Sequence, residues 1–167
     1  ITYGNDRYVA VGESALILSS LGPDAEKNWN WTLQDPPAEF AGDYEAITFG
    51  EGFFMAAGSE AGDGIIYRAA NGALGLACTV ADDDGGVGGI EYGNGNFVAV
   101  GAYTDGDTVG VIQLTTAPET AFENQTPADI PDGWTNFSFT IVHFTGTHFI
   151  ISGPGEPPVG GDQQVLQ

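Results

Sequence analysis

The chain has 167 residues, of which 42% are hydrophobic, so its length suits one compact domain with a substantial core. Its charge is one-sided, because 23 acidic residues and only three lysines and arginines give a formal net charge of −20. Such a surface repels nucleic-acid phosphates and anionic lipid headgroups, and no apolar run reaches the length of a membrane span, so we expect no nucleic-acid partner and no membrane insertion. The acidic excess suits a saline or calcium-rich extracellular setting.

Four stretches of twelve residues share one pattern of two short apolar runs around a turn. In chain order they read ITYGNDRYVAVG (1–12), ITFGEGFFMAAG (47–58), IEYGNGNFVAVG (90–101) and VHFTGTHFIISG (142–153). The Asn94-Gly95 pair takes positive φ easily and favours the type I′ turn of a two-residue β-hairpin, and Gly101 is expected to end the second strand. The copies start 46, 43 and 52 residues apart, a period typical of stacked or radial units.

A two-residue turn fixes which side chains face each other across a hairpin. Each copy then gains one aromatic pair: Tyr3 with Tyr8, Phe49 with Phe54, Tyr92 with Phe97, and Phe144 with Phe149. The second runs are apolar on both faces, as in Phe97-Val98-Ala99-Val100, so we expect each hairpin to be covered on two sides by neighbouring sheets.

Two further strands are predicted after each of the first three hairpins, from apolar and β-favouring runs. These are 15–19 and 29–33, then 64–68 and 76–80, then 109–115 and 134–137, the last pair separated by a polar, proline-bearing excursion over 118–131. The fourth copy stops before an outer strand. The resulting units cover about 1–43, 44–86, 87–138 and 139–167.

The hairpin pattern, followed by an apolar strand ending in serine, a turn and a tryptophan, resembles the repeats of sialidase-like and photosystem II assembly factor-like β-propellers. The resemblance implies an all-β propeller with four-stranded antiparallel blades, closed by four units or part of a larger ring. It also implies an extracellular or virion-surface location, since such repeats occur in bacterial secreted proteins and phage virion proteins. Ser20, Asp24 and Trp29 or Trp31 resemble the Asp-box of these families at a stretched spacing and without its glycine.

Catalysis is not predicted, and we assign no catalytic residue. Sialidases hold their substrate carboxylate with three arginines, whereas this chain has only Arg7 and Arg68. No nucleophile-elbow or zinc-protease motif occurs, and His143 and His148 lack a third histidine to complete a zinc site. The chain is therefore predicted not to be an enzyme.

Calcium is the one cofactor that the sequence leaves open. Asp82 and Asp84 lie in one acidic loop, and Asp105 and Asp107 lie in another, with oxygen ligands close together as a hard cation requires. Neither loop has the spacing of an EF-hand. Solvated loops without an ion are the alternative interpretation.

Three function hypotheses follow. The first is a structural or protein-binding module of an extracellular or virion assembly, such as a tail, appendage or filament, with other subunits or further copies of itself as partners. The second is a carbohydrate-binding propeller whose exposed aromatic rings, Trp29, Trp31, Tyr103 and Trp134, stack on glycans. The third is an enzyme completed by a longer chain. Open ends would expose large apolar faces, so we expect the first and fourth units to be covered by each other or by a neighbouring subunit.

Overall fold

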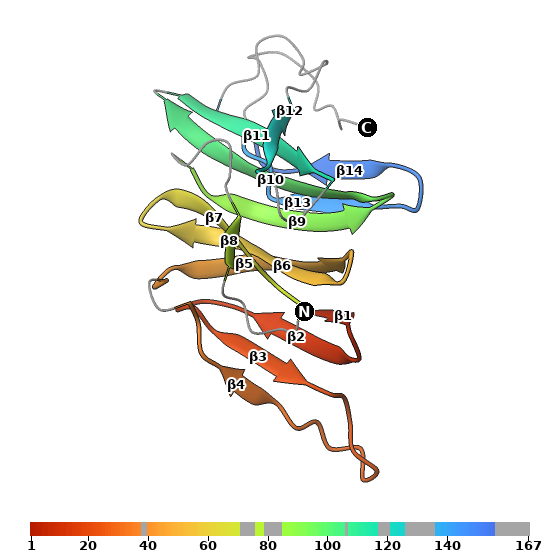
Figure 1. Ribbon diagram of the computed structural model, residues 1–167. Helices are drawn as coiled ribbons and strands as arrows, with labels where there is room; N and C mark the ends of the chain where they lie inside the picture. The colour runs from red at the N-terminus through yellow and green to blue at the C-terminus, as the bar shows by residue number, and fades with distance from the viewer. Residues whose placement is uncertain are drawn as a thin grey trace.

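The computed structural model describes residues 1–37, 40–70, 76–78, 85–105, 107–116, 121–125 and 136–155. All regular structure in these residues is β-strand, arranged in small antiparallel sheets, and none of them is helical (Figure 1). The prediction of an all-β chain is therefore confirmed.

Three sheets have four strands each, paired in chain order, and a fourth has two strands. The first sheet comprises β1 (Thr2–Gly4), β2 (Arg7–Val11), β3 (Ile17–Ser20) and β4 (Thr32–Gln34). The second comprises β5 (Asp43–Gly50), β6 (Phe53–Glu60), β7 (Asp63–Ala69) and β8 (Leu76–Cys78). The third comprises β9 (Val87–Gly93), β10 (Asn96–Asp105), β11 (Asp107–Thr115) and β12 (Glu123–Gln125), and the fourth comprises β13 (Ile141–Phe144) and β14 (Phe149–Ser152).

The hairpin that opens each sheet has the predicted register. The four aromatic pairs lie directly opposite each other, with ring centroids 4.6 Å apart in the first sheet and 4.8 Å apart in the other three. Both central turn residues have positive φ in the first three hairpins, as a type I′ turn requires, for example 50° at Asn94 and 78° at Gly95. In the fourth hairpin Gly146 has a φ of 98° and is the first of its two turn residues. The register prediction is confirmed.

Several strand boundaries differ from the prediction. Gly101 does not end its strand, because β10 continues to Asp105 after a register shift between Val100 and Gly101. A Cβ at Gly101 would lie 2.1 Å from the carbonyl oxygen of Gly86, so glycine permits a bulge where two backbones meet.

The outermost strands also differ. In the first sheet β4 begins at Thr32, so the predicted strand 29–33 is largely a loop. In the third sheet β12 pairs with β11 inside the stretch assigned to the polar excursion, whereas Asn136 and Phe137 lie outside any strand. Short outer strands pair on one side only, and tertiary pairing rather than local composition places them.

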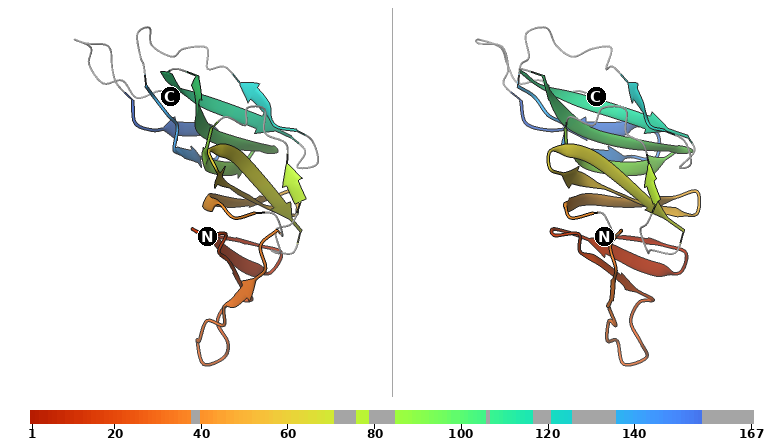
Figure 2. Two further views of the ribbon diagram at one scale, coloured as in Figure 1. Left: turned by 90° about the vertical axis from the view of Figure 1, so that its left-hand side faces the viewer. Right: turned by 60° about the vertical axis from the view of Figure 1, so that its left-hand side comes forward.

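The sheets stack face to face, with the first and fourth sheets toward opposite ends (Figures 1 and 2). The first strands of successive sheets are in contact, β1 with β5, β5 with β9 and β9 with β13. Each sheet has an aromatic face, which carries its aromatic pair, and an opposite face, which we call its aliphatic face. The closing of these sheets into a ring is not seen in the described part of the chain.

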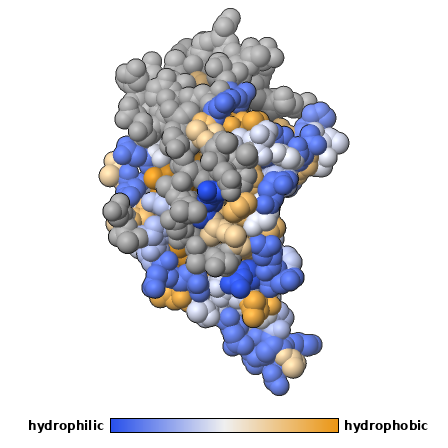
Figure 3. Space-filling view, in the orientation of Figure 1, coloured by the Kyte–Doolittle hydropathy of each residue, from blue (hydrophilic) through white to orange (hydrophobic). Residues whose placement is uncertain are grey.

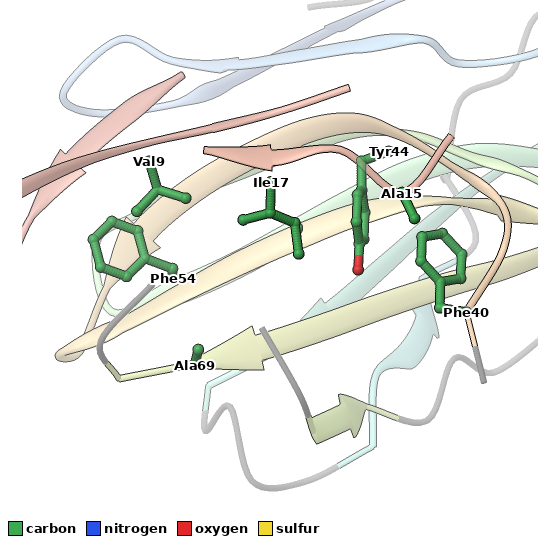
Figure 4. Close-up of a cluster of buried hydrophobic side chains, with 8 residues drawn as sticks. Val9, Ala15, Ile17, Phe40, Tyr44, Phe54 and Ala69 are labelled. Atoms are coloured by element: carbon green, nitrogen blue, oxygen red, sulfur yellow. The ribbon is translucent and has the colours of Figure 1, made fainter. Parts of the chain in front are cut away.

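The aromatic face of each sheet packs on the aliphatic face of the sheet before it, and the core lies in these joints. Figure 4 shows the first joint, where Val9 and Ile17 of the first sheet meet Phe54 and Ala69 of the second. In the second joint Met55 and Ala57 meet Phe97 and Ala99. The third joint brings Val98 and Val100 against Val142 and Phe149.

One contact recurs in all three joints: an aromatic ring lies on the glycine that ends the first strand of the preceding sheet. A Cβ would lie 2.1 Å from the Phe49 ring if added to Gly4, and 2.2 Å from the Tyr92 ring if added to Gly50. At Gly93 it would lie 2.2 Å from the ring of Phe144. Real Cβ atoms do not approach so closely, so glycine is required at each joint.

Hydrogen bonds across the joints fix the same arrangement. The Asn5 amide donates to the carbonyl oxygens of Gly52 and Ala70, at 3.0 and 2.6 Å. At the next joint the Tyr92 N–H donates to Thr48 Oγ1 at 3.2 Å, and the Tyr92 hydroxyl donates to the carboxylate of Glu51. Because the Glu51 carboxylate accepts this hydrogen bond, it raises the pKa of Tyr92.

Candidate functional site

The aromatic face of the first sheet is an apolar surface that the described residues leave open. By register, Tyr3, Tyr8, Ala10, Leu18 and Leu33 share this face. Tyr3 is 54% exposed and Leu33 is 67% exposed. The corresponding aromatic faces of the second and third sheets are buried, and Phe54 and Phe97, at the repeat position of Tyr8, have no exposed surface. The first sheet thus presents to solvent a face that its neighbours bury.

Trp29 and Trp31 extend this face along the loop between β3 and β4. Trp29 packs edge-on against Tyr8, with ring centroids 4.8 Å apart, and stacks on Trp31 at 5.8 Å with 12° between the ring planes. Since Tyr8 also contacts Tyr3, four rings form one continuous ladder. Trp29 and Trp31 remain 45% and 37% exposed. The space-filling view shows hydrophobic patches beside hydrophilic ones over the first sheet, at the lower part of the molecule (Figure 3).

The carboxylate of Asp24 organises the loop that carries the two tryptophans. It accepts hydrogen bonds from the N–H groups of Asn28 at 2.8 Å and Glu26 at 3.1 Å, and from the side-chain amide of Asn30 at 3.2 Å. The bond from the Asn28 N–H is the main reason why the pKa of Asp24 is lowered. The loop is closed by a β-bridge between Pro23 and Trp29. Asp24 therefore stabilises the loop from which the two tryptophans extend.

A polar cleft of about 570 Å³ lies beside the same loop. Its lining includes Arg7, Ser20, Asp24, Asn30 and Gln34. Within the residues that the structure covers, the Arg7 side chain makes no hydrogen bond or ion pair. By register, Ser19, Thr32 and Gln34 of this lining lie on the aliphatic face, so the cleft offers hydrogen-bond donors and acceptors on the side of the sheet opposite the exposed rings.

The predicted ligand-binding residues are only partly brought together. Trp29 and Trp31 lie in contact, as described. Tyr103 lies in β10 opposite Val109, on the third sheet, and its side-chain surroundings are outside the described residues. Trp134 also lies outside the described residues.

The predicted calcium ligands are placed only in part. Asp105 at the end of β10 and Asp107 at the start of β11 are paired in the backbone register, whereas Asp82 and Asp84 lie outside the described residues. Over the ranges that the structure describes, no group of three or more histidine, cysteine, aspartate or glutamate side chains could hold a metal ion. The calcium site stays a prediction.

Two parts of the site were missed by reasoning from the sequence. Tyr8 and Leu33 were not named as surface residues, because the burial of Phe54 and Phe97 at the repeat position of Tyr8 is the rule in the other sheets and no described sheet covers this face of the first. Arg7 was considered only in the argument that the chain has too few arginines for a sialidase site. Its position in the cleft depends on how the loop folds back, which no local pattern reveals.

No protein-family model and no curated protein matches the chain. In the stretches that the structure describes, no helix is long and apolar enough to cross a membrane.

Proposed function

We propose that the protein is a non-enzymatic structural or protein-binding module of an extracellular or virion assembly, and that the aromatic face of the first sheet is its contact surface. The observation that carries this proposal is the open face itself. Tyr3 and Tyr8 form the same pair, at the same repeat positions, as three pairs that lie in sheet-to-sheet joints. Because the matching faces of the other sheets pack against a neighbouring sheet, an open face of the same kind is best suited to contact with another protein.

We interpret the sheets as propeller blades. Each four-stranded sheet is an antiparallel meander in chain order, and the first strands of successive sheets are in contact, as they are around the centre of a propeller. Within one chain the first and fourth sheets lie apart, so the ring would be larger than these four units or would include another subunit. Either arrangement makes the chain a building block.

The experiment compares two exposed leucines by sedimentation velocity. Leu33 lies on the aromatic face, whereas Leu21, which is 77% exposed, lines the cleft instead. Association of the wild type should increase with protein concentration in roughly 1 M sodium chloride, where charge repulsion is screened. Leu33→Ser should weaken it and Leu21→Ser should not. A wild type that stays monomeric throughout, or equal effects of both substitutions, would contradict the proposal.

Carbohydrate binding is a second candidate, favoured by the exposed Trp29–Trp31 stack. A glycan array with the wild type and with Trp31→Ala tests it, and repeating the array with calcium tests the ion. Binding that is lost in Trp31→Ala but kept in Leu33→Ser would favour this function. Absence of any Trp31-dependent binding would leave the protein-contact function.

A further inference from the structure

We propose that the aromatic face of the first sheet binds most tightly to one kind of partner, a further sheet of this repeat type whose first strand ends in glycine. We also infer that Thr145 weakens, without abolishing, the docking of the fourth sheet of a second copy on this face. This inference rests on the proposed function, because it names the partner of the same face. The inference specifies a steric requirement for the partner, namely a glycine where the Tyr3 ring would lie.

The face continues a series of joints that the chain already contains. In each joint an aromatic ring covers the terminal glycine of the preceding first strand: Phe49 on Gly4, Tyr92 on Gly50, and Phe144 on Gly93. Tyr3 occupies the same repeat position as these rings. If the first strand of a partner sheet ended in glycine, the Tyr3 ring could lie on that glycine, as the other three rings lie on theirs.

The open pair already has the geometry of the seated pairs. The rings of Tyr3 and Tyr8 are tilted by 49°, and the rings of Tyr92 and Phe97, which lie in a joint, are tilted by the same 49°. Tyr3 is held further by a hydrogen bond from its hydroxyl to Asp6, at 3.4 Å. Little rearrangement is therefore needed on docking, which favours association.

The fourth sheet lacks the glycine at this position. Thr145 follows β13 where Gly4, Gly50 and Gly93 end their strands. A Cβ at Gly93 would lie 2.2 Å from its ring, so the Cβ of Thr145 would clash with a ring seated in the same way. The Thr145 hydroxyl also donates to the His148 carbonyl oxygen at 3.1 Å and accepts from the His148 N–H at 3.2 Å, which holds this side chain over the turn.

Apart from Thr145, the aliphatic face of the fourth sheet has apolar side chains that could pack against another sheet. On the aliphatic face of the fourth sheet Ile141 is 59% exposed and Ile150 is 44% exposed. Ile150 has the repeat position of Val9, which is fully buried in the first joint. Thr145 is thus the residue that opposes head-to-tail stacking of copies, and stacking that does not close would form filaments.

The test removes the obstacle and leaves the rest of the chain intact. Thr145→Gly offers Tyr3 of a second copy a glycine, whereas Thr145→Ala loses the same hydroxyl but keeps the Cβ. A third variant carries Thr145→Gly, Gly146→Asn and Thr147→Gly, which copies the turn of the third sheet and protects against a poorly formed hairpin. Sedimentation velocity measures association, and circular dichroism checks that each variant is folded.

We expect both glycine variants to associate at about tenfold lower concentration than the wild type. Thr145→Ala should behave as the wild type, and adding Tyr3→Ser to either glycine variant should abolish the gain. The inference is overturned if Thr145→Ala gains as much as Thr145→Gly, if neither glycine variant gains, or if the gain survives Tyr3→Ser. Loss of wild-type association in Leu33→Ser together with an unchanged Thr145→Gly would refute the inference while leaving the proposed function standing.

Discussion

The ring of Tyr92 lies directly on Gly50, so close that a Cβ on this glycine would lie 2.2 Å from the ring. Gly50→Ala should therefore force the second and third sheets apart and lower the free energy of unfolding by about 1–3 kcal/mol or more, as overpacking does. Gly12→Ala is the matched control, because the nearest side-chain atom would lie 3.9 Å from its added Cβ. Urea unfolding of both variants measures the difference, and equal midpoints would disprove the ring-on-glycine joint.

Phe97 and Tyr8 hold the same repeat position but differ in burial, since Phe97 has no exposed surface and Tyr8 faces the open side of the first sheet. Phe97→Ala should cost about 3–5 kcal/mol in the free energy of unfolding, because it removes a ring from a closed core. Tyr8→Ala should cost clearly less. Chemical denaturation decides between this order and the reverse, which would mean that the first sheet is covered in solution.

Salt should stabilise the fold. With 23 acidic residues against three lysines and arginines, folding concentrates negative charge that ions screen, so the melting temperature should rise between low and roughly 1 M sodium chloride. At matched ionic strength, calcium should raise it more than magnesium only if it is bound. If calcium does act specifically, a variant with Asp105→Asn and Asp107→Asn tests whether those residues hold it. Equal shifts from the two ions would leave screening as the explanation.

Glu91 should make stability depend on pH. Burial raises the pKa of this carboxyl, against the opposing effects of the Tyr92 N–H and of His143. A raised pKa in the folded state means that the folded protein holds the proton more tightly, so its favourable contribution is complete below the usual glutamate pKa. That contribution is lost as pH rises through the raised value.

Glu91→Gln should therefore raise the melting temperature at pH 7 by at most about 2–4 °C and give no such advantage near pH 3.5. The exposed Glu45 provides the control, because Glu45→Gln removes one charge from the same acidic surface without removing a buried carboxyl. Thermal melts at both pH values measure the effect. A pH-independent gain in Glu91→Gln would show that the burial of its charge is unimportant.

The hairpins could be predicted because their signals are local. An Asn-Gly turn sets the register, and the register alone brings Tyr92 opposite Phe97. The alternation of Trp29, Asn30 and Trp31 suggested a strand that does not form there. The Asp24 side chain accepts hydrogen bonds from the N–H groups of Glu26 and Asn28, and this loop structure just before the tryptophans competes with strand pairing.

The candidate site shows the same division. The proximity of Trp29 and Trp31 could be predicted from their spacing in the sequence. The contact of Trp29 with Tyr8 could not, because it requires the loop to fold back on the sheet. The terminal glycines of the first strands were visible in the repeats. Their role was not, because the ring that requires each glycine belongs to the next unit, some 45 residues further along the chain.

The joints between the sheets link each unit mainly to its chain neighbours, as the contacts of β5 with β1 and β9 illustrate. In such a linear array, cooperativity is passed from one interface to the next, and a unit with one interface is held less firmly than a unit with two. Amide hydrogen exchange should then be slowest around Phe54 and Ala99, and faster in the first and fourth sheets. A partner seated on Tyr3 would convert one fraying end into an interior position, so binding at that end would slow exchange across the whole first sheet.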